Sequence, residues 1–222
     1  MDPLLVRLGR LDSCALSDAL DKLGLTGAVT GIHRVSTERQ ISGRVVTVRL
    51  ERDEGRPAAS RHLGTAAVEA AHSGDVIVIE QRTGIDAAGW GGNLSLGAKL
   101  RGVAGVIVDG PTRDVDEARS YDFPVFARDH TSRTARGRIV ETGTNVAITV
   151  GDVVVSPGDY VVADGSAVVF VVADAIERVL ETAEAIAGRE RAMAASLREG
   201  APISQVMGKS YETMLKGTGQ EE

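Results

Sequence analysis

Apolar and polar positions alternate along the chain with periods that distinguish helices from strands. In residues 11–24 the apolar side chains recur at helical spacing and stop at Gly24, which predicts an opening helix. The alternating, β-branched run 43–50 predicts a strand. The continuous apolar run 75–80 predicts a strand that is covered on both faces.

The segments that follow each strand have helical patterns. The alanine-rich stretch 58–75 predicts a helix that ends at Ser73 and Gly74. The elements predicted after it are a helix over 93–102, a strand over 105–110, a short helix over 114–121 and a strand over 123–127. Helices and strands therefore alternate, which is typical of an α/β fold.

From about Asn145 the pattern changes to short strands separated by tight turns. These runs, which predict a compact antiparallel patch, are 145–150, 152–156, 160–164 and 167–172. A long amphipathic helix is predicted over about 174–200, with Gly188 inside it and a polar tail after it. We find no linker or internal repeat, and we expect a single layered α/β domain over residues 1–222.

Composition narrows the classes of partner. The net charge of −6 and the aromatic content of 3% argue against nucleic-acid binding, which needs clustered cations or stacking rings. Cys14 is the sole cysteine, so no intramolecular disulfide can form, and we expect a buried thiol on a helix in a reducing compartment. No apolar run is long enough for a membrane span and no signal peptide is evident, so a cytoplasmic location is expected.

A glycine-rich bend, GWGGN (89–93), precedes the helix predicted from residue 93. The first N–H groups of a helix have no intrahelical partner and lie at the positive end of its dipole, so they bind anions. We expect the amides of Gly91, Gly92, Asn93 and Leu94 to converge on a carboxylate or phosphate, with Asn93 as the helix cap. The alternative is that these glycines only turn the chain.

The strand predicted over 105–110 leads directly into Arg113 and Asp114. Because ligands gather at the carboxyl ends of strands, this turn and the glycine bend could line one crevice. Arginine offers a planar fork for a carboxylate or an alkoxide, and aspartate offers a hard oxygen for a cation. A single carboxylate favours Mg²⁺ or Mn²⁺ over zinc. The alternative is an aspartate that starts a helix beside a solvated arginine.

The sequence gives weaker signals for other kinds of site. A dinucleotide or S-adenosylmethionine site is suggested by Gly89 and Gly91, with Asp109 about 20 residues on as the ribose ligand, but the third glycine position is Leu94. Glu80 and Asp86 could support metal-bound waters or lie on the surface. No zinc site is predicted, because metal-binding spacing is absent among the histidines His33, His62, His72 and His130.

The segment GGNLSLGAKLRGVAGVIVDGPTRDVDEARSYDFPVFAR (91–128) resembles the signature of the RraA-like family, which includes 4-hydroxy-4-methyl-2-oxoglutarate / 4-carboxy-4-hydroxy-2-oxoadipate aldolases. The similarity extends to residues 13–24, 41–48 and 153–164. The G-N-L, D-G-x-x-R-D and P-G-D elements occur in the family's order and spacing. The resemblance covers most of residues 11–170.

The resemblance implies a layered, swivelling β/β/α domain that assembles as a homotrimer or hexamer with active sites at subunit interfaces. In the aldolases the aspartate aligned with Asp114 binds the divalent metal, and the arginine aligned with Arg113 contacts the substrate. The backbone aligned with Gly92, Asn93 and Leu94 holds the pyruvate carboxylate. An acidic residue of a neighbouring subunit, which we do not assign, supports the metal.

The activity implied is that of a metal-dependent class II aldolase. It cleaves a 4-hydroxy-2-oxo diacid to pyruvate and a second oxo acid, with oxaloacetate decarboxylation as a side activity. The expected partner is thus a small 2-oxo acid, with no nucleic acid and no membrane. The alternative is a non-catalytic regulator that binds an RNA-degrading endonuclease. Regulators of ribonuclease E in this family lack an intact R-D pair, whereas this chain keeps Arg113 and Asp114.

The chain departs from the family's pattern at a few positions. Ser166 and Ala167 replace a common Asp-Gly pair, and Val172 replaces a proline at a strand end. Trp90 in the glycine bend is also unusual. We expect Trp90 to pack under the bend, with closure of the pocket over a substrate as the alternative, because large aromatic side chains are usually well buried. These departures leave the predicted metal ligand intact.

Overall fold

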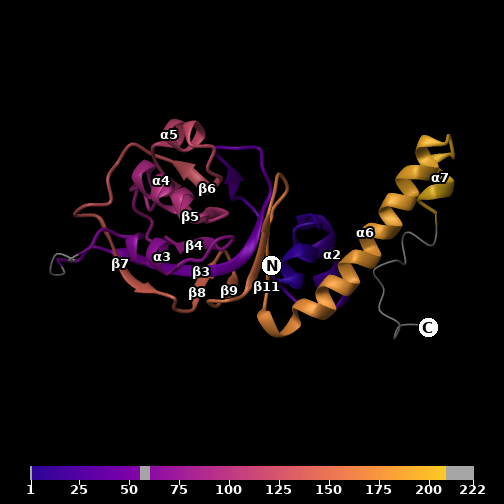
Figure 1. The fold of residues 1–222 in the computed structure, drawn as a ribbon, viewed down its shortest axis with the longest axis horizontal. Coiled ribbons are helices and arrows are strands. Elements are labelled where there is room, and N and C mark those ends of the chain that lie inside the picture. Colours follow the sequence, from indigo (N-terminus) through magenta and orange to yellow (C-terminus); the bar gives the residue numbers. More distant parts are fainter. Residues whose placement is uncertain (1, 56–60, 209–222) are drawn as a thin grey trace.

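The computed structural model describes residues 2–55 and 61–208, and a large mixed sheet runs through this part of the chain (Figure 1). The strand order is β1-β11-β10-β3-β4-β5-β6-β2, and β7 pairs with β3 off this path. The strands are β1 (Ala28–Val29), β2 (His33–Arg34), β3 (Ile41–Arg52), β4 (Val76–Glu80), β5 (Gly105–Thr112), β6 (Val125–His130), β7 (Ile139–Thr144), β10 (Tyr160–Ala163) and β11 (Val168–Val171). A separate hairpin is formed by β8 (Ile148–Val150) and β9 (Val153–Val155).

The centre of the sheet is parallel and fully covered. Strands β3, β4, β5 and β6 pair in parallel, and the continuous apolar run in β4 is buried on both faces, as its sequence predicts. Strand β3 is longer than the predicted 43–50, because its first residues pair with β10 and its last residues pair with β7. The antiparallel strands therefore extend both ends of one parallel core.

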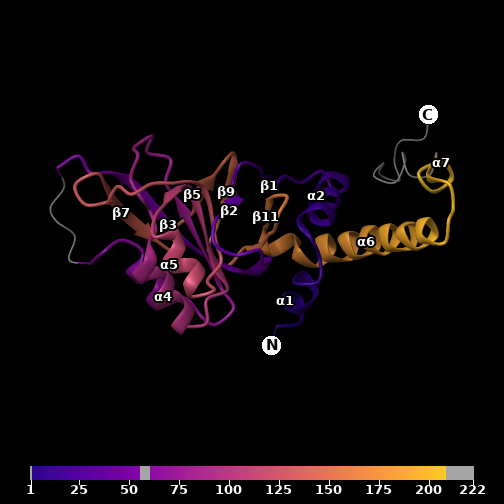
Figure 2. The ribbon, with the colours of Figure 1, turned by 90° about the horizontal axis from the view of Figure 1, so that it is seen from above.

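Helices cover the sheet in separate layers. They are α1 (Pro3–Leu8), α2 (Ser13–Lys22), α3 (Thr65–Ala70), α4 (Gly92–Leu100), α5 (Val115–Ser120), α6 (Ile176–Arg198) and α7 (Ile203–Val206), with a 3₁₀ turn at Ala173–Ala175. Figures 1 and 2 show α3, α4 and α5 on one face of the parallel strands and the β8–β9 hairpin on the other. The expected layered α/β fold is confirmed.

The side chains of β4 show how these layers arise. Ile77 and Ile79 pack into the cluster that includes α3, α4 and α5, whereas Val76 and Val78 pack into the cluster that includes the hairpin. Successive strand residues point to opposite faces, so one apolar run supplies both layers. Each such buried side chain stabilises the fold by about 1.5–3 kcal/mol relative to exposure.

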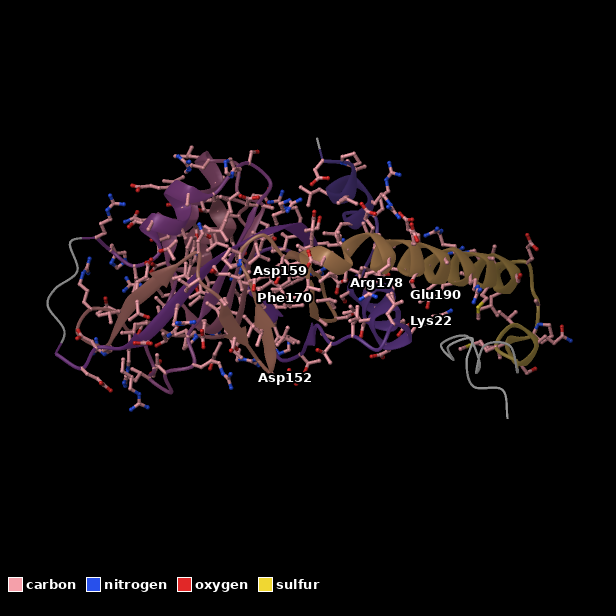
Figure 3. The ribbon with its side chains drawn as sticks, turned by 90° about the horizontal axis from the view of Figure 1, so that it is seen from below. Lys22, Asp152, Asp159, Phe170, Arg178 and Glu190 are labelled. Carbon is pink, nitrogen blue, oxygen red and sulfur yellow. The ribbon has the colours of Figure 1, made fainter. Side chains whose placement is uncertain are left out.

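Helix α6 projects beyond the body of the molecule (Figure 2). Its first half packs with α1 and α2 over β10 and β11, and its last buried residue is Ile186. Figure 3 shows Arg178 near the body and Glu190 farther out along the helix. Among the described helices, none combines the length and the apolarity that a bilayer span requires.

Two helical predictions need correction. The helix predicted over 58–75 is much shorter, because Gly64 has a left-handed backbone before α3 and Ala71 is extended after it; residues 58–60 lie outside the described ranges. Cys14 is exposed, not buried. It lies outside the apolar stripe of α2, which is formed by Ala15, Leu16, Ala19 and Leu20.

The predicted antiparallel patch is also only partly correct. The β8–β9 hairpin is local, but β10 and β11 join the large sheet through β3. Strand β7 and the two-residue strands β1 and β2 were not predicted. Apolar and polar residues that alternate at every second position show that a segment is a strand. This alternation does not show which distant strand the segment pairs with.

Candidate functional site

The glycine bend is bonded to the end of β5. The amide of Gly89 donates to the carbonyl of Pro111 at 3.0 Å, and the amide of Arg113 donates to the carbonyl of Trp90 at 3.0 Å. The hydroxyl of Thr112 also donates to the Trp90 carbonyl, at 3.2 Å. These bonds bring the bend and the Arg113–Asp114 turn together, as the strand order predicts.

The start of α4 presents backbone N–H groups to this region. Gly91 is the N-cap with an extended backbone, and the amide of Ser95 makes the first helical bond, to the Gly91 carbonyl at 3.0 Å. The amides of Asn93 and Leu94 precede that bond and so have no helical partner. The predicted capping role of Asn93 is wrong, because α4 starts at Gly92 and its N-cap residue is Gly91, which makes no side-chain cap bond.

Asp114 is turned toward α4. Its backbone is left-handed, with φ of 57° and ψ of 40°, and its side chain does not cap α5 although it precedes that helix. Its carboxylate accepts from the Gly92 amide at 3.0 Å and from Arg113 Nε at 3.1 Å. The side chain is 30% exposed. The carboxylate therefore lies beside the backbone amides that were predicted to bind an anion. It already accepts a hydrogen bond from one of them, the amide of Gly92.

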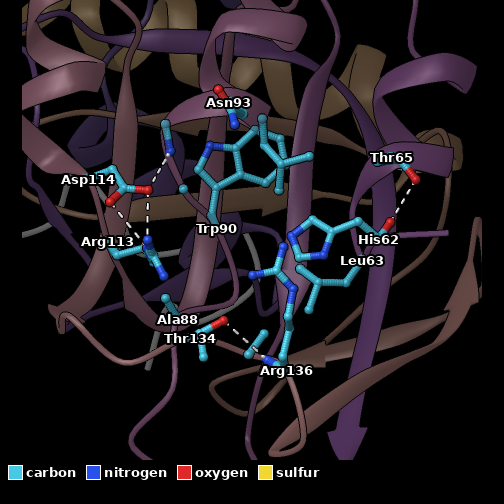
Figure 4. A pocket seen from close by; sticks show the side chains of 14 residues that line it. His62, Leu63, Thr65, Ala88, Trp90, Asn93, Arg113, Asp114, Thr134 and Arg136 are labelled. Atoms are coloured by element: carbon cyan, nitrogen blue, oxygen red, sulfur yellow. Dashed lines mark hydrogen bonds and ion pairs between the residues drawn. The ribbon is translucent and has the colours of Figure 1, made fainter. Parts of the chain in front are cut away.

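A pocket of about 300 Å³ opens in front of these groups (Figure 4). Its middle is largely apolar, and polar groups stand around it. The lining residues are His62, Leu63, Thr65, Ala88, Trp90, Gly91, Gly92, Asn93, Leu94, Arg113, Asp114, Thr134, Ala135 and Arg136. All six residues predicted for the site line this one pocket, although their roles remain predictions.

Trp90 lies in the glycine bend, and its side chain lines the pocket. It is 2% exposed, and its Nε1 donates to Ser95 Oγ at 2.9 Å. The expected packing role is confirmed. Because the indole is held by α4, it fixes the bend relative to the helix start.

Sequence reasoning missed Glu117, a second carboxylate that lies close to the start of α4 although it does not line the pocket. A Cβ atom built on Gly92 would lie 1.8 Å from Glu117 Oε2 and 3.2 Å from the Cβ of Asp114. Glu117 follows Asp114 by three residues and lies in the first turn of α5, and this short separation of two acids could have identified it. Among the described residues, no group of three or more His, Cys, Asp or Glu forms a metal cluster.

His62 was also missed, because histidine spacing gave no signal. Burial, and then the positive charges of Arg136 and Arg113, lower the pKa of His62, while Glu141 acts in the opposite direction. His62 precedes α3 and Arg136 precedes β7. The pocket thus carries basic groups from three separate segments.

Other candidates lie elsewhere. Asp109 lies inside β5, where Arg128 Nε donates to it and the Gly151 amide donates at 2.8 Å, so its carboxylate is already engaged and does not suit a ribose. Glu80 pairs with Arg49 and Asp86 pairs with Arg133. Neither acid lines the pocket.

Of the positions that depart from the family's pattern, Trp90 lines the pocket, whereas Ser166, Ala167 and Val172 do not. The amides of Ser166 and Ala167 donate to Asp164 in the turn between β10 and β11. Val172 lies at the start of the 3₁₀ turn and is exposed. These three substitutions therefore leave the pocket of their own chain unchanged.

The curated proteins that are similar to this chain match it over only part of their own length. Protein DlpA of Legionella pneumophila is 27% identical over 205 residues, which make up 92% of this chain and 33% of that protein. A Halalkalibacterium halodurans protein named provisionally as a 4-hydroxy-4-methyl-2-oxoglutarate aldolase is 32% identical over 64% of each chain. The chain therefore spans less than two thirds of the length of either relative.

Solved structures are similar over most of this chain. A Pseudomonas syringae protein described as uncharacterized has a TM-score of 0.84 and 26% identity, covering 94% of this chain and 98% of its own. Streptomyces coelicolor RraAS2, described as an unusual member of the RNase ES inhibitor RraA family, has a TM-score of 0.75 and 25% identity, with 86% and 95% coverage. The family model described as RraA-like, Aldolase/RraA, matches residues 13–170. The chain belongs to the RraA-like family.

Proposed function

We propose that this protein is a divalent-metal-dependent lyase that cleaves a 4-hydroxy-2-oxo diacid to pyruvate and a second oxo acid. The observation that carries the proposal is the position of Asp114. Its half-buried carboxylate lies at the edge of a pocket, beside the α4 N-terminus and Arg113. A cation ligand, an anion-binding helix start and a guanidinium thus meet at one place.

The residues present fit Mg²⁺ or Mn²⁺. Asp114 accepts two donors, which leaves lone pairs of the carboxylate for a cation. Glu117 adds a second carboxylate near Gly92. Mg²⁺ is commonly held by one or two carboxylates, with waters and substrate oxygens completing its shell. Asp114 and Glu117 would hold the cation, which when bound supplies a Lewis acid for the keto oxygen of the substrate.

The remaining groups have separate roles. The amides of Asn93 and Leu94 bind the carboxylate next to the keto group, through the unpaired N–H groups of the helix start. Arg113 orients the substrate and stabilises the C4 oxygen through the guanidinium nitrogens that do not face Asp114. A water molecule takes the proton of the C4 hydroxyl, and the C3–C4 bond breaks, so that C4 becomes the carbonyl carbon of the second oxo acid. The electron pair of that bond forms the enolate of pyruvate, which takes a proton back from water at C3.

Oxaloacetate decarboxylation follows from the same arrangement. Loss of CO₂ from oxaloacetate leaves the same pyruvate enolate, so the groups that stabilise the aldol product also stabilise this one. Neither reaction needs a Schiff-base lysine. Lys99 is exposed on α4 and its Nζ donates to the carbonyl of Tyr121, away from the pocket lining.

The decisive experiment measures pyruvate release from 4-hydroxy-2-oxo diacids and from oxaloacetate. We expect EDTA to abolish release and Mg²⁺ or Mn²⁺ to restore it. Asp114→Ala should lower kcat/KM about 1000-fold, a loss typical for removal of an electrostatic catalytic group. Asp116→Ala is the matched control, because Asp116 lies on α5 but is exposed and pairs with Arg119. Full activity in EDTA would refute the metal-dependent reaction.

We also propose that the protein assembles as a homotrimer or hexamer with active sites at subunit interfaces. The family resemblance suggests this assembly, and two features support it. One chain places a single acid, Asp114, in the pocket lining, with Glu117 close to Gly92 outside it, which leaves room for an acid from a neighbour. The outer part of α6, beyond Ile186, has no buried residue within the described single chain.

A further inference from the structure

The side of the pocket away from Asp114 carries basic groups that the proposed bond cleavage does not use. Figure 4 shows the imidazole of His62 and the guanidinium of Arg136 beside each other, with Arg113 and Asp114 at the other side. Both residues line the pocket and both are exposed, although the pocket walls enclose part of His62. In the described ranges, no carboxylate forms an ion pair with Arg136. A solvent-accessible guanidinium without a carboxylate partner is available to an anionic ligand.

The surroundings of His62 indicate a surplus of positive charge. Arg136 and Arg113 both act on its imidazole, and with burial as the largest cause they lower its pKa; Glu141 is the carboxylate that opposes them. Glu141 is itself engaged, because the Gly64 amide donates to it at 2.6 Å and the Thr144 hydroxyl also donates to it. An anion between His62 and Arg136 would relieve this repulsion.

Apolar side chains also line the pocket. Leu63, Trp90 and Leu94 line it, and the volume of about 300 Å³ is at the lower limit of typical ligand pockets. The short aliphatic chain of a ligand would pack against these apolar side chains. Polar groups that bind anions stand at both sides, the α4 amides at one and Arg136 with His62 at the other.

We infer that Arg136 and His62 form the subsite for the distal carboxylate of a dicarboxylic 2-oxo acid. They are specificity determinants, because they select diacids over monoacids and do not touch the reacting bond. The inference rests on the proposed function, since the 2-oxo acid end must occupy the α4 amides for the distal carboxylate to reach Arg136.

The test compares the binding of two ligands that differ only at the distal end. 2-Oxoglutarate and 2-oxopentanoate share the 2-oxo acid end, and neither has the 4-hydroxyl needed for cleavage. In calorimetry with Mg²⁺ present, we expect 2-oxoglutarate to bind about tenfold more tightly or better, as for hydrogen bonds to charged groups. Arg136→Gln should abolish this preference and leave pyruvate binding unchanged. Arg133→Gln should retain it, because Arg133 pairs with Asp86 outside the pocket.

A second readout follows His62 directly. In histidine NMR titrations, saturating 2-oxoglutarate should raise the pKa of His62, whereas 2-oxopentanoate should not. A preference for the diacid that survives in Arg136→Gln would overturn the inference, as would equal binding of both ligands by the unmodified protein. If neither ligand nor pyruvate binds with Mg²⁺ present, the proposed function fails, and the inference fails with it.

Discussion

Asp114 adopts a backbone conformation that residues other than glycine rarely take. The left-handed conformation costs roughly 1–2 kcal/mol for a residue with a Cβ. The strained turn points the carboxylate at the Gly92 amide and Arg113 instead of at the N–H groups of α5. Local strain retained at such a position is typical of functional sites.

Residue chemistry alone was sufficient to select Arg113 and Asp114, because a guanidinium and a carboxylate follow directly on a strand end. It was not sufficient for His62 or Arg136. Arg136 precedes β7, which pairs with β3, and His62 precedes α3, which packs against β3, so both residues reach the pocket through long-range contacts. Such proximity depends on long-range strand pairing, which the sequence pattern did not reveal.

A residue-scale prediction concerns Asp164, which joins α2 to the end of β10. Its carboxylate accepts from the amide and the hydroxyl of Ser13, each at 2.7 Å, and from the Ser166 amide at 2.9 Å. Burial acts to raise the pKa of Asp164, but these hydrogen bonds outweigh it and hold the pKa below its usual value of 3.8. Asp164→Asn should lower the free energy of unfolding at pH 7 by about 2 kcal/mol.

The pH dependence of that loss has a definite sign. Because the folded-state pKa of Asp164 is lowered, its carboxylate contributes its full stabilisation of the fold at pH values above the usual pKa of 3.8. This stabilisation is lost as the pH falls through the lowered pKa. Urea unfolding should therefore show the gap between the unmodified protein and Asp164→Asn narrowing in acid. Ser166→Ala is the control, since only the backbone of Ser166 contacts Asp164. A gap that widens in acid would contradict this assignment.

At the scale of elements, helix and strand types followed from local patterns, whereas pairing did not. The run in β4 has the residues of a strand buried on both faces, and it is one. The burial of strand β7 does not alternate along its length, and its residues gave no clear period. Its place beside β3 depends on an irregular register near Arg49 and Leu50, which no local pattern specifies.

The close approach of α4 to α5 gives an element-scale prediction. Gly92 begins α4, and a Cβ there would overlap Glu117 Oε2 at 1.8 Å. Gly92→Ala should displace Glu117, and we expect kcat/KM for pyruvate release to fall about 100-fold, by loss of one electrostatic contact. Thermal unfolding should change little, because an exposed glutamate can move away.

Gly97→Ala on the same helix is the matched control. A Cβ at Gly97 would lie 3.8 Å from Val68 Cγ1, an ordinary contact distance. Because alanine is favoured over glycine inside a helix, this variant should keep its activity and gain roughly 0.5–1 kcal/mol of stability. Equal activity of both variants would show that the fit between Glu117 and Gly92 does not matter for catalysis.

At the scale of the whole molecule, charge and family membership leave two kinds of function to separate. The net charge of −6 would suit a basic protein partner as well as it suits a soluble enzyme. Among the structural relatives, RraAS2 is named within an RNase inhibitor family. A regulator would keep its partner in Asp114→Ala and would release no pyruvate from any 2-oxo acid. Asp114 thus separates the two functions.

The last prediction concerns assembly. The outer part of α6 extends from the body without buried residues, and the pocket has a basic, exposed side. If active sites lie at subunit interfaces, light scattering should give three or six times the chain mass of 23.2 kDa. Specific activity should then fall on dilution in parallel with dissociation, because separated subunits lack the neighbour's acid. A monomer with full specific activity at all concentrations would contradict the interfacial site while leaving the metal-dependent reaction intact.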